Sequence, residues 1–318
     1  MKALSGISDV YYSGTRIQET DHVFGNNYAG SILEKARSGK FDMHYVRNNP
    51  KLFRKLPGKK IFFVSPYYKK VFAQADGIAS LTKEWTRRLR NGVTTHGYPA
   101  KYRNDKVWTF HQTVNSMFKP LRDHPKTQKI RKSIGGRFII GHFGSLRRSC
   151  YPYSFLKILP DIQKKYPGVR VMFSTKKAAN THNISDKSII EKPFGYNDMP
   201  YAISACDLIL YNFRGTDGHF IGSMKILEAM ACGVPVLSPR FTAREEELGK
   251  DYELFYDFVE NGGYFGSKIE KQMKNLIIGL IEDEKNRERV GKRLLKRVKF
   301  YQMKESRKRL KKILGEIL

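Results

Sequence analysis

The sequence predicts an α/β protein with two domains, each built on a sheet of parallel strands. A chain of 318 residues, 40% of them hydrophobic, is long enough to form two separate cores. Short apolar runs of strand length alternate along it with segments of helical periodicity, which is typical of βαβ units. The clearest example is the stretch 206–239, which predicts a strand, a loop, a helix and a second strand.

The start of the helix in this stretch is the first candidate site. Asp207–Tyr211 predicts a buried strand, and Ser223 is a favourable N-cap for a helix that we expect to end at Gly233. The N–H groups at such a helix start face the carboxyl end of the preceding strand, where open α/β sheets bind anions. We therefore expect Gly222 and Ser223 to hold phosphate through their backbone. Glu228, within the helix, is placed to accept hydrogen bonds from a sugar hydroxyl.

The run K-I-L-E-A-M-A-C-G-V-P-V, residues 225–236, resembles the signature of the retaining glycosyltransferases of the GT-B fold, the group 1 or family 4 class that uses nucleotide-sugar donors. The resemblance implies two Rossmann-like domains that face a cleft. It also implies that Glu228 binds the donor ribose and that the backbone before it cradles the diphosphate. The alternative is that Glu228 is an ordinary helix carboxylate.

One position departs from the family pattern. The family commonly has a second glutamate eight residues before the first, near the transferred sugar, and this chain has Phe220 there. Either Asp217 replaces it after a loop rearrangement, or the sugar is recognised differently.

Residues 1–120 predict the acceptor-side domain, with strands at 41–46 and 60–64, a short strand and a helix between 73 and 92, and a crossover segment at 106–111. The opening strand and Gly-rich loop of the family are not found in residues 1–30. This domain is therefore expected to be shortened, because the chain is truncated, because the acceptor half is reduced, or because a partner completes it. His44 is the candidate for the family's histidine, and a structural role is its alternative.

Residues 121–300 predict the nucleotide-sugar-binding domain, which opens with a basic linker at 121–136 and a strand at 137–143. The turn that follows, Gly144 to Arg148, lies at the mouth of the sheet, where cations neutralise a diphosphate leaving group. In the resembled family an Arg and a Lys in this turn do so. Arg147 and Arg148 are the candidates here, with two solvated arginines as the alternative. Lys225 is a further candidate for the diphosphate, or a solvent-facing residue.

The remaining elements of this domain follow in order. We expect helices at 153–165, 201–205 and 242–248, and strands at 169–174, 188–191, 234–237 and 252–256. The residues around Gly195 resemble the stretch of the family whose backbone contacts the nucleobase. Residues 268–318 are helical by periodicity, and a break at 300–303 is expected to send residues 301–318 back to the first domain.

The charge is the unusual part of the composition, with 59 Lys and Arg against 30 Asp and Glu and a formal charge of +29. This excess favours a polyanionic neighbour or reflects a Lys-rich composition. The basic segment 306–314 is either a contact to an anionic membrane or a solvated face. Three cysteines without metal spacing suit a reducing compartment, and there is no apolar run of about 18 residues. We expect a cytoplasmic protein, with peripheral contact to the inner membrane face as an option.

The sequence therefore predicts a retaining glycosyltransferase that moves a sugar from a nucleoside diphosphate sugar to a saccharide, lipid-linked or protein acceptor, without metal or other cofactor. The expected catalytic residues are Arg147, Arg148 and Lys225, and the expected donor-binding residues are Gly144, Gly195, Gly222, Ser223 and Glu228. Serine-hydrolase elbows, zinc-protease motifs and Walker loops are not found. The alternatives are a catalytically impaired or partner-dependent nucleotide-sugar-binding protein, and a basic nucleic-acid-binding protein, the least favoured of the three.

Overall fold

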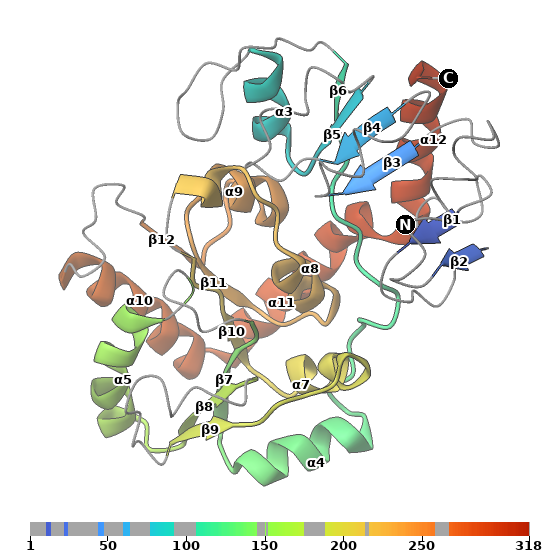
Figure 1. The fold of residues 1–318 in the computed structure, drawn as a ribbon. Helices are drawn as coiled ribbons and strands as arrows, with labels where there is room; N and C mark the ends of the chain where they lie inside the picture. Colours follow the sequence, from blue (N-terminus) through green and yellow to red (C-terminus); the bar gives the residue numbers. More distant parts are fainter. Residues whose placement is uncertain are drawn as a thin grey trace. The chain divides into compact units, whose positions relative to one another are not determined.

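The computed structural model describes residues 11–13, 22–24, 44–47, 60–63, 77–91, 106–144, 150, 152–174, 188–213, 216–257 and 267–317 (Figure 1). The chain divides into two compact units. Unit 1 comprises Met1–Thr113, Phe220–Gly222 and Tyr301–Leu318, and unit 2 comprises Val114–His219 and Ser223–Phe300. The sequence placed the division at residue 120 and did not indicate that residues 220–222 group with the first unit.

Unit 1 contains a parallel sheet with the strand order β3-β4-β5-β6. The strands are β3 (His44–Arg47), β4 (Lys60–Phe63), β5 (Gly77–Ser80) and β6 (Val107–Thr109). β1 (Tyr11–Ser13) and β2 (His22–Phe24) pair in parallel as a separate sheet. The expectation of a crossover at 106–111 was wrong, because Val107 is fully buried and pairs with Ile78 of β5.

Two helices of unit 1 contact this sheet at β6. In α3 (Lys83–Arg90), the Thr82 hydroxyl caps the helix by accepting a hydrogen bond from the N–H of Trp85 at 3.1 Å. The C-terminal helix α12 (Met303–Ile317) is joined to the chain around β6 by two side-chain hydrogen bonds. Trp108 donates to Glu316 at 2.7 Å, and Thr113 donates to Ser306 at 2.8 Å.

Unit 2 contains a six-stranded parallel sheet in the order β12-β11-β10-β7-β8-β9. The strands are β7 (Phe138–His142), β8 (Val169–Phe173), β9 (Ile189–Glu191), β10 (Leu208–Leu210), β11 (Val236–Pro239) and β12 (Phe255–Tyr256). Counted from the first strand of the unit, this is the doubly wound order 3-2-1-4-5-6, whose direction reverses between β7 and β10. The α/β fold class predicted from the sequence is confirmed.

The helices of unit 2 cover both faces of this sheet, with α10 against α5 and α11 against α8 (Figure 1). They are α4 (Pro125–Ile134), α5 (Tyr153–Lys165), α7 (Met199–Ser204), α8 (Met224–Ala231), α9 (Thr242–Leu248), α10 (Ser267–Glu282) and α11 (Glu284–Val298). Short 3-10 turns lie at Tyr196–Asp198, Thr216–His219 and Lys299–Tyr301.

The predicted linker at 121–136 is instead the helix α4. The imidazole of His124 accepts a hydrogen bond from the N–H of Lys126 at 3.1 Å, and Pro125 occupies the first helical turn. Gly135 ends the helix in the left-handed conformation, with φ of 73°. Its three buried residues, Thr127, Ile130 and Ile134, follow helical spacing. Lys126, Lys129 and Lys132 lie on the exposed face of this packed helix, whereas the side chain of Arg131 is largely buried.

Asp207, at the start of β10, joins three elements of unit 2. Its carboxylate accepts hydrogen bonds from the backbone N–H of Ile139 at 2.8 Å, from Arg122 at 2.5 Å and from Arg131 of α4 at 3.1 Å. The side chain is only 5% exposed. A buried carboxylate with this many donors fixes α4 and the start of β10 against β7.

Candidate functional site

The carboxyl ends of β7 and β10 form the switch point of the unit 2 sheet, where doubly wound sheets bind their ligands. The two strands are joined there by the imidazole Nδ1 of His142, which lies 3.1 Å from the carbonyl oxygen of Leu210. Gly144 follows β7 with φ of 152° and is exposed. Arg147 and Arg148, predicted to bind diphosphate, lie outside the described residues and remain predictions.

Glu228 is the central carboxylate of α8, and it is 2% exposed. Its Oε2 atom lies 2.8 Å from Nζ of Lys225, one turn earlier on the same helix. The Lys225 side chain is 33% exposed, so the pair presents its cation to solvent and its anion to the interior. Burial raises the pKa of Glu228, and Lys225 opposes this shift. The structure therefore brings together these two residues that the sequence predicted separately.

The charge of the same carboxylate acts on Tyr196. Tyr196 is 53% exposed, and its ring meets Phe118 edge-on at a centroid distance of 5.8 Å. Partial burial raises the pKa of Tyr196, and the charge of Glu228 raises it further, whereas a hydrogen bond with Asn115 opposes both. Gly195 precedes this tyrosine and begins the 3-10 turn. The stretch predicted to contact a nucleobase and the carboxylate predicted to bind ribose thus lie within electrostatic reach of each other.

The N–H group of Ser223 already has an anionic partner. It donates a hydrogen bond to Oε1 of Glu247 at 2.6 Å. The other Glu247 oxygen is paired with Arg244, whose guanidinium lies 5.0 Å from the ring centroid of Tyr211. Burial raises the pKa of Glu247 to about 7, against the opposing effects of Arg244 and of the Ser223 N–H. Ser223 occupies the N-cap position, but its side chain makes no capping hydrogen bond.

The Glu247 and Arg244 pair was not predicted from the sequence. The only signal was a short Glu-rich helix after β11, in which the two residues lie three positions apart. Their contact with the start of α8 joins residues 24 positions apart, so it depends on the tertiary fold.

Phe220, which stands where the resembled family has its second glutamate, belongs to unit 1 and is 3% exposed. Its ring lies 5.7 Å from the ring of Trp85, and the guanidinium of Arg88 lies 4.1 Å from its centroid. The hydroxyl of Thr82 donates to its carbonyl oxygen at 2.8 Å. Phe220 therefore anchors its segment on α3 of unit 1.

Gly222 belongs to the same short segment of unit 1 and is half-buried. The side chain of Asp217 lies outside the described residues. So does that of His44, whose backbone is the first residue of β3.

Within the described part of the chain, no group of three or more His, Cys, Asp or Glu side chains is arranged to hold a metal ion. No described helix is long and apolar enough to cross a membrane.

Comparisons with known proteins agree with the fold. Residues 158–315 match the model of a family described as glycosyl transferase-like. HepE from Anabaena, in complex with UDP and glucose, is 13% identical with a TM-score of 0.68, and the alignment covers 94% of this chain and 86% of HepE. Sucrose-phosphate synthase from Thermosynechococcus elongatus is 12% identical with a TM-score of 0.66, covering 91% and 77%.

The pneumococcal O-GlcNAc transferase GtfA, in complex with UDP and GlcNAc, is 12% identical with a TM-score of 0.67. The alignment covers 90% of this chain and 59% of GtfA. A search of curated proteins finds no match.

Proposed function

We propose that this protein transfers a sugar from a nucleoside diphosphate sugar to an acceptor. The proposal starts from the match of residues 158–315 to the glycosyl transferase-like family and from the GT-B fold of the chain. The observation that carries the proposal is the buried Glu228, which is paired with Lys225 and lies within electrostatic reach of Tyr196. A uridine nucleotide is the first donor to test, since similar structures hold UDP.

The proposed roles follow from the chemistry of these groups. Glu228 accepts hydrogen bonds from the ribose hydroxyls of the donor, because an ionised carboxylate is an acceptor only. Lys225 supplies positive charge to the diphosphate, together with Arg147 or Arg148 and the backbone N–H group of Gly222. The N–H group of Ser223 takes part only if the phosphate displaces the carboxylate of Glu247. The exposed ring of Tyr196, after Gly195, offers a surface for the base.

We further propose that the transfer proceeds with retention, as the resemblance of residues 225–236 implies. The bond between the sugar and the diphosphate breaks, and an acceptor hydroxyl forms the new bond on the same face. The acceptor proton passes to an oxygen of the departing diphosphate. The residues of this chain stabilise the negative charge that develops on that group. The acceptor class is a saccharide, a lipid-linked molecule or a protein.

A second candidate function is nucleotide-sugar binding without turnover by the isolated chain. Phe220 favours it, because a buried aromatic ring takes the place of the carboxylate that the resembled family has near the transferred sugar.

The test is donor binding and turnover by the purified chain. Glu228→Ala should weaken the binding of UDP by about 1 to 3 kcal/mol, because its hydrogen bonds to ribose are lost. The matched control is Glu288→Ala, which removes an exposed helical glutamate that is also paired with a lysine, Lys292. Unchanged affinity in Glu228→Ala would reject the assigned role. Release of UDP from UDP-sugars supports the transferase, whereas binding without release supports the second candidate.

A further inference from the structure

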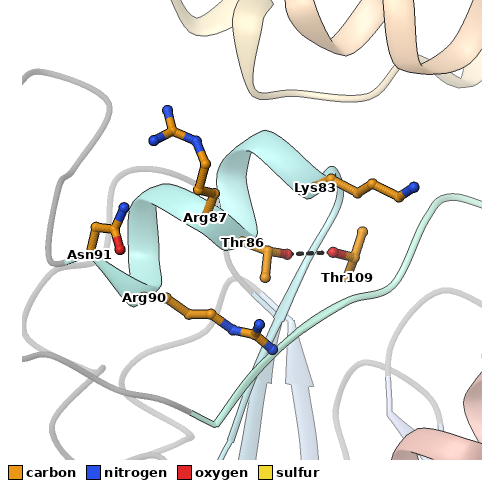
Figure 2. A pocket seen from close by; sticks show the side chains of 6 residues that line it. All are labelled: Lys83, Thr86, Arg87, Arg90, Asn91 and Thr109. Atoms are coloured by element: carbon orange, nitrogen blue, oxygen red, sulfur yellow. Dashed lines mark hydrogen bonds between the residues drawn. The ribbon is translucent and has the colours of Figure 1, made fainter.

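A polar depression lies on unit 1, along one side of α3 and the end of β6 (Figure 2). Its volume is about 290 Å³, just below the range for small-molecule sites. It is lined by Lys83, Thr86, Arg87, Arg90, Asn91 and Thr109. Among the described residues, none of those assigned to the donor lines it, so the proposed function does not account for it.

The described residues of the lining carry positive charge and include no acid. Lys83, Arg87 and Arg90 follow one another at intervals of four and three residues, which places them along one side of the helix. The nearby acid, Glu84, is 15% exposed and is already bonded to Arg87 and Arg88. One carboxylate shared between two guanidinium groups leaves this side of α3 with an excess of positive charge, which suits an anionic ligand.

The two arginines are held in place before any ligand binds. Arg87 makes two hydrogen bonds to the Glu84 carboxylate, at 2.9 and 2.8 Å. Arg90 donates through Nε and Nη2 to the carbonyl oxygen of Val107, at 3.1 and 2.6 Å. Because these hydrogen bonds already restrict the long side chains, less conformational entropy is lost when an anion binds. Guanidinium groups also match the geometry of phosphate oxygens.

Neutral polar groups complete the lining. The hydroxyls of Thr86 and Thr109 lie 2.6 Å apart, and Figure 2 shows this pair between the side chains of Lys83 and Arg90. Asn91 adds an amide, which both donates and accepts hydrogen bonds. Hydroxyls and an amide suit the hydroxyl groups of a ligand, whereas the cations suit a phosphate.

We infer that this depression binds a hydroxylated molecule that carries a phosphate. This inference does not rest on the proposed function. A soluble polyol or sugar phosphate and the phosphate headgroup of a lipid share this chemistry.

The test measures binding of labelled glycerol 3-phosphate to the full chain by equilibrium dialysis. Saturating UDP is present, so that the donor site does not contribute. Unlabelled glycerol should not compete, because it has the hydroxyls without the phosphate. The double variant Lys83→Gln with Arg87→Gln should bind glycerol 3-phosphate at least about tenfold more weakly than the wild type. A loss of this size corresponds to one charge-assisted hydrogen bond. Arg88 still pairs with Glu84 in this variant.

The matched control is Lys304→Gln with Lys308→Gln, which removes the same charge from α12 of the same unit. It should bind like the wild type. A second variant, Thr109→Val, keeps every charge and should weaken binding by removing one hydroxyl from the lining. Binding that is undetectable in the wild type, or equal in the wild type and in Lys83→Gln with Arg87→Gln, overturns the inference.

A parallel competition experiment distinguishes a lipid headgroup from a soluble phosphate as the natural ligand. Vesicles of phosphatidylcholine with phosphatidic acid should compete with glycerol 3-phosphate if the natural ligand is a lipid, and fail to compete if it is soluble. Binding of labelled UDP is measured on the same samples. If UDP does not bind while glycerol 3-phosphate does so in the charge-dependent way, the proposed function fails and the phosphate site stands.

Discussion

The carboxylate of Glu247 accepts a hydrogen bond from the backbone N–H of Ser223 at 2.6 Å, at the start of α8. The helix start that the sequence predicted for phosphate is therefore occupied by an anionic oxygen of the protein itself. A phosphate that used the same N–H would have to displace this carboxylate. Arg244, paired with the other oxygen, keeps Glu247 in the buried position.

The stability of the wild type relative to Glu247→Gln should fall as the pH rises from about 5 to about 8. Burial raises the pKa of Glu247 from its ordinary value of 4.5 to about 7, so the folded protein holds this proton more tightly than the unfolded chain. The resulting stabilisation is complete below pH 4.5 and is lost as the pH passes through about 7. The expected change is about 1 to 3 kcal/mol, measured by urea unfolding of both proteins at each pH.

Groups other than residue 247 titrate alike in the two proteins, so their difference isolates this carboxyl. If the free energy of unfolding of the wild type rises relative to that of the variant as the pH rises, the ion pair with Arg244 stabilises the ionised carboxylate by more than burial destabilises it.

Asp207→Ala should lower the free energy of unfolding by about 3 to 5 kcal/mol, because it leaves two arginines and the N–H of Ile139 without their buried carboxylate. The control is Asp161→Ala on α5, whose 65% exposed carboxylate is paired with Lys274. Asp161→Ala should lower the free energy of unfolding by less than about 1 kcal/mol. Equal effects in chemical unfolding would contradict the structural role given to Asp207.

Two of the three cysteines should resist thiol reagents in the folded protein. Cys206 and Cys232 are buried, and burial raises the pKa of Cys206 well above its ordinary value and that of Cys232 to about 12. Cys150 is half-buried. A colorimetric thiol assay should therefore count one fast thiol in the native state and three in denaturant. Rapid labelling of all three without denaturant would be inconsistent with the packing of unit 2.

Two helical glycines should respond oppositely to alanine. A Cβ atom at Gly291 of α11 would collide with the carbonyl oxygen of Gly233, so Gly291→Ala should cost about 1 to 3 kcal/mol. A Cβ at Gly279 of α10 meets nothing within 4 Å. Gly279→Ala should therefore stabilise the protein by about 0.5 to 1 kcal/mol through helix propensity. Thermal unfolding of both variants provides the measurement, and destabilisation by Gly279→Ala would refute this account.

Local patterns predicted much of unit 2. The bounds of α5 and α9 agree with the sequence expectation. In α5 the apolar residues follow helical spacing, and α9 is a short segment rich in Glu, a good helix former. The α4 helix was missed because its basic composition outweighed the three buried positions. The short strand β6 was missed because only its pairing with β5 identifies it.

In the candidate site, too, local contacts could be predicted and distant ones could not. The run at 225–236 indicated the helix that carries Lys225 and Glu228, and residues three positions apart on a helix are neighbours, so their contact follows from the helix alone. The contacts of Ser223 with Glu247 and of Phe220 with Trp85 join residues far apart in the chain. No local spacing encodes such pairs, so they became visible only in the folded protein.

The position of β7 in the middle of its sheet has a consequence for biosynthesis. β7 pairs with β8 on one edge, but its other edge pairs with β10, which the ribosome adds only after residue 207. Until then the nascent chain exposes an apolar strand edge, which is a template for aggregation. Fragments that end between β9 and β10 should accordingly accumulate as inclusion bodies, and slowing translation in that interval should lower the yield of native protein.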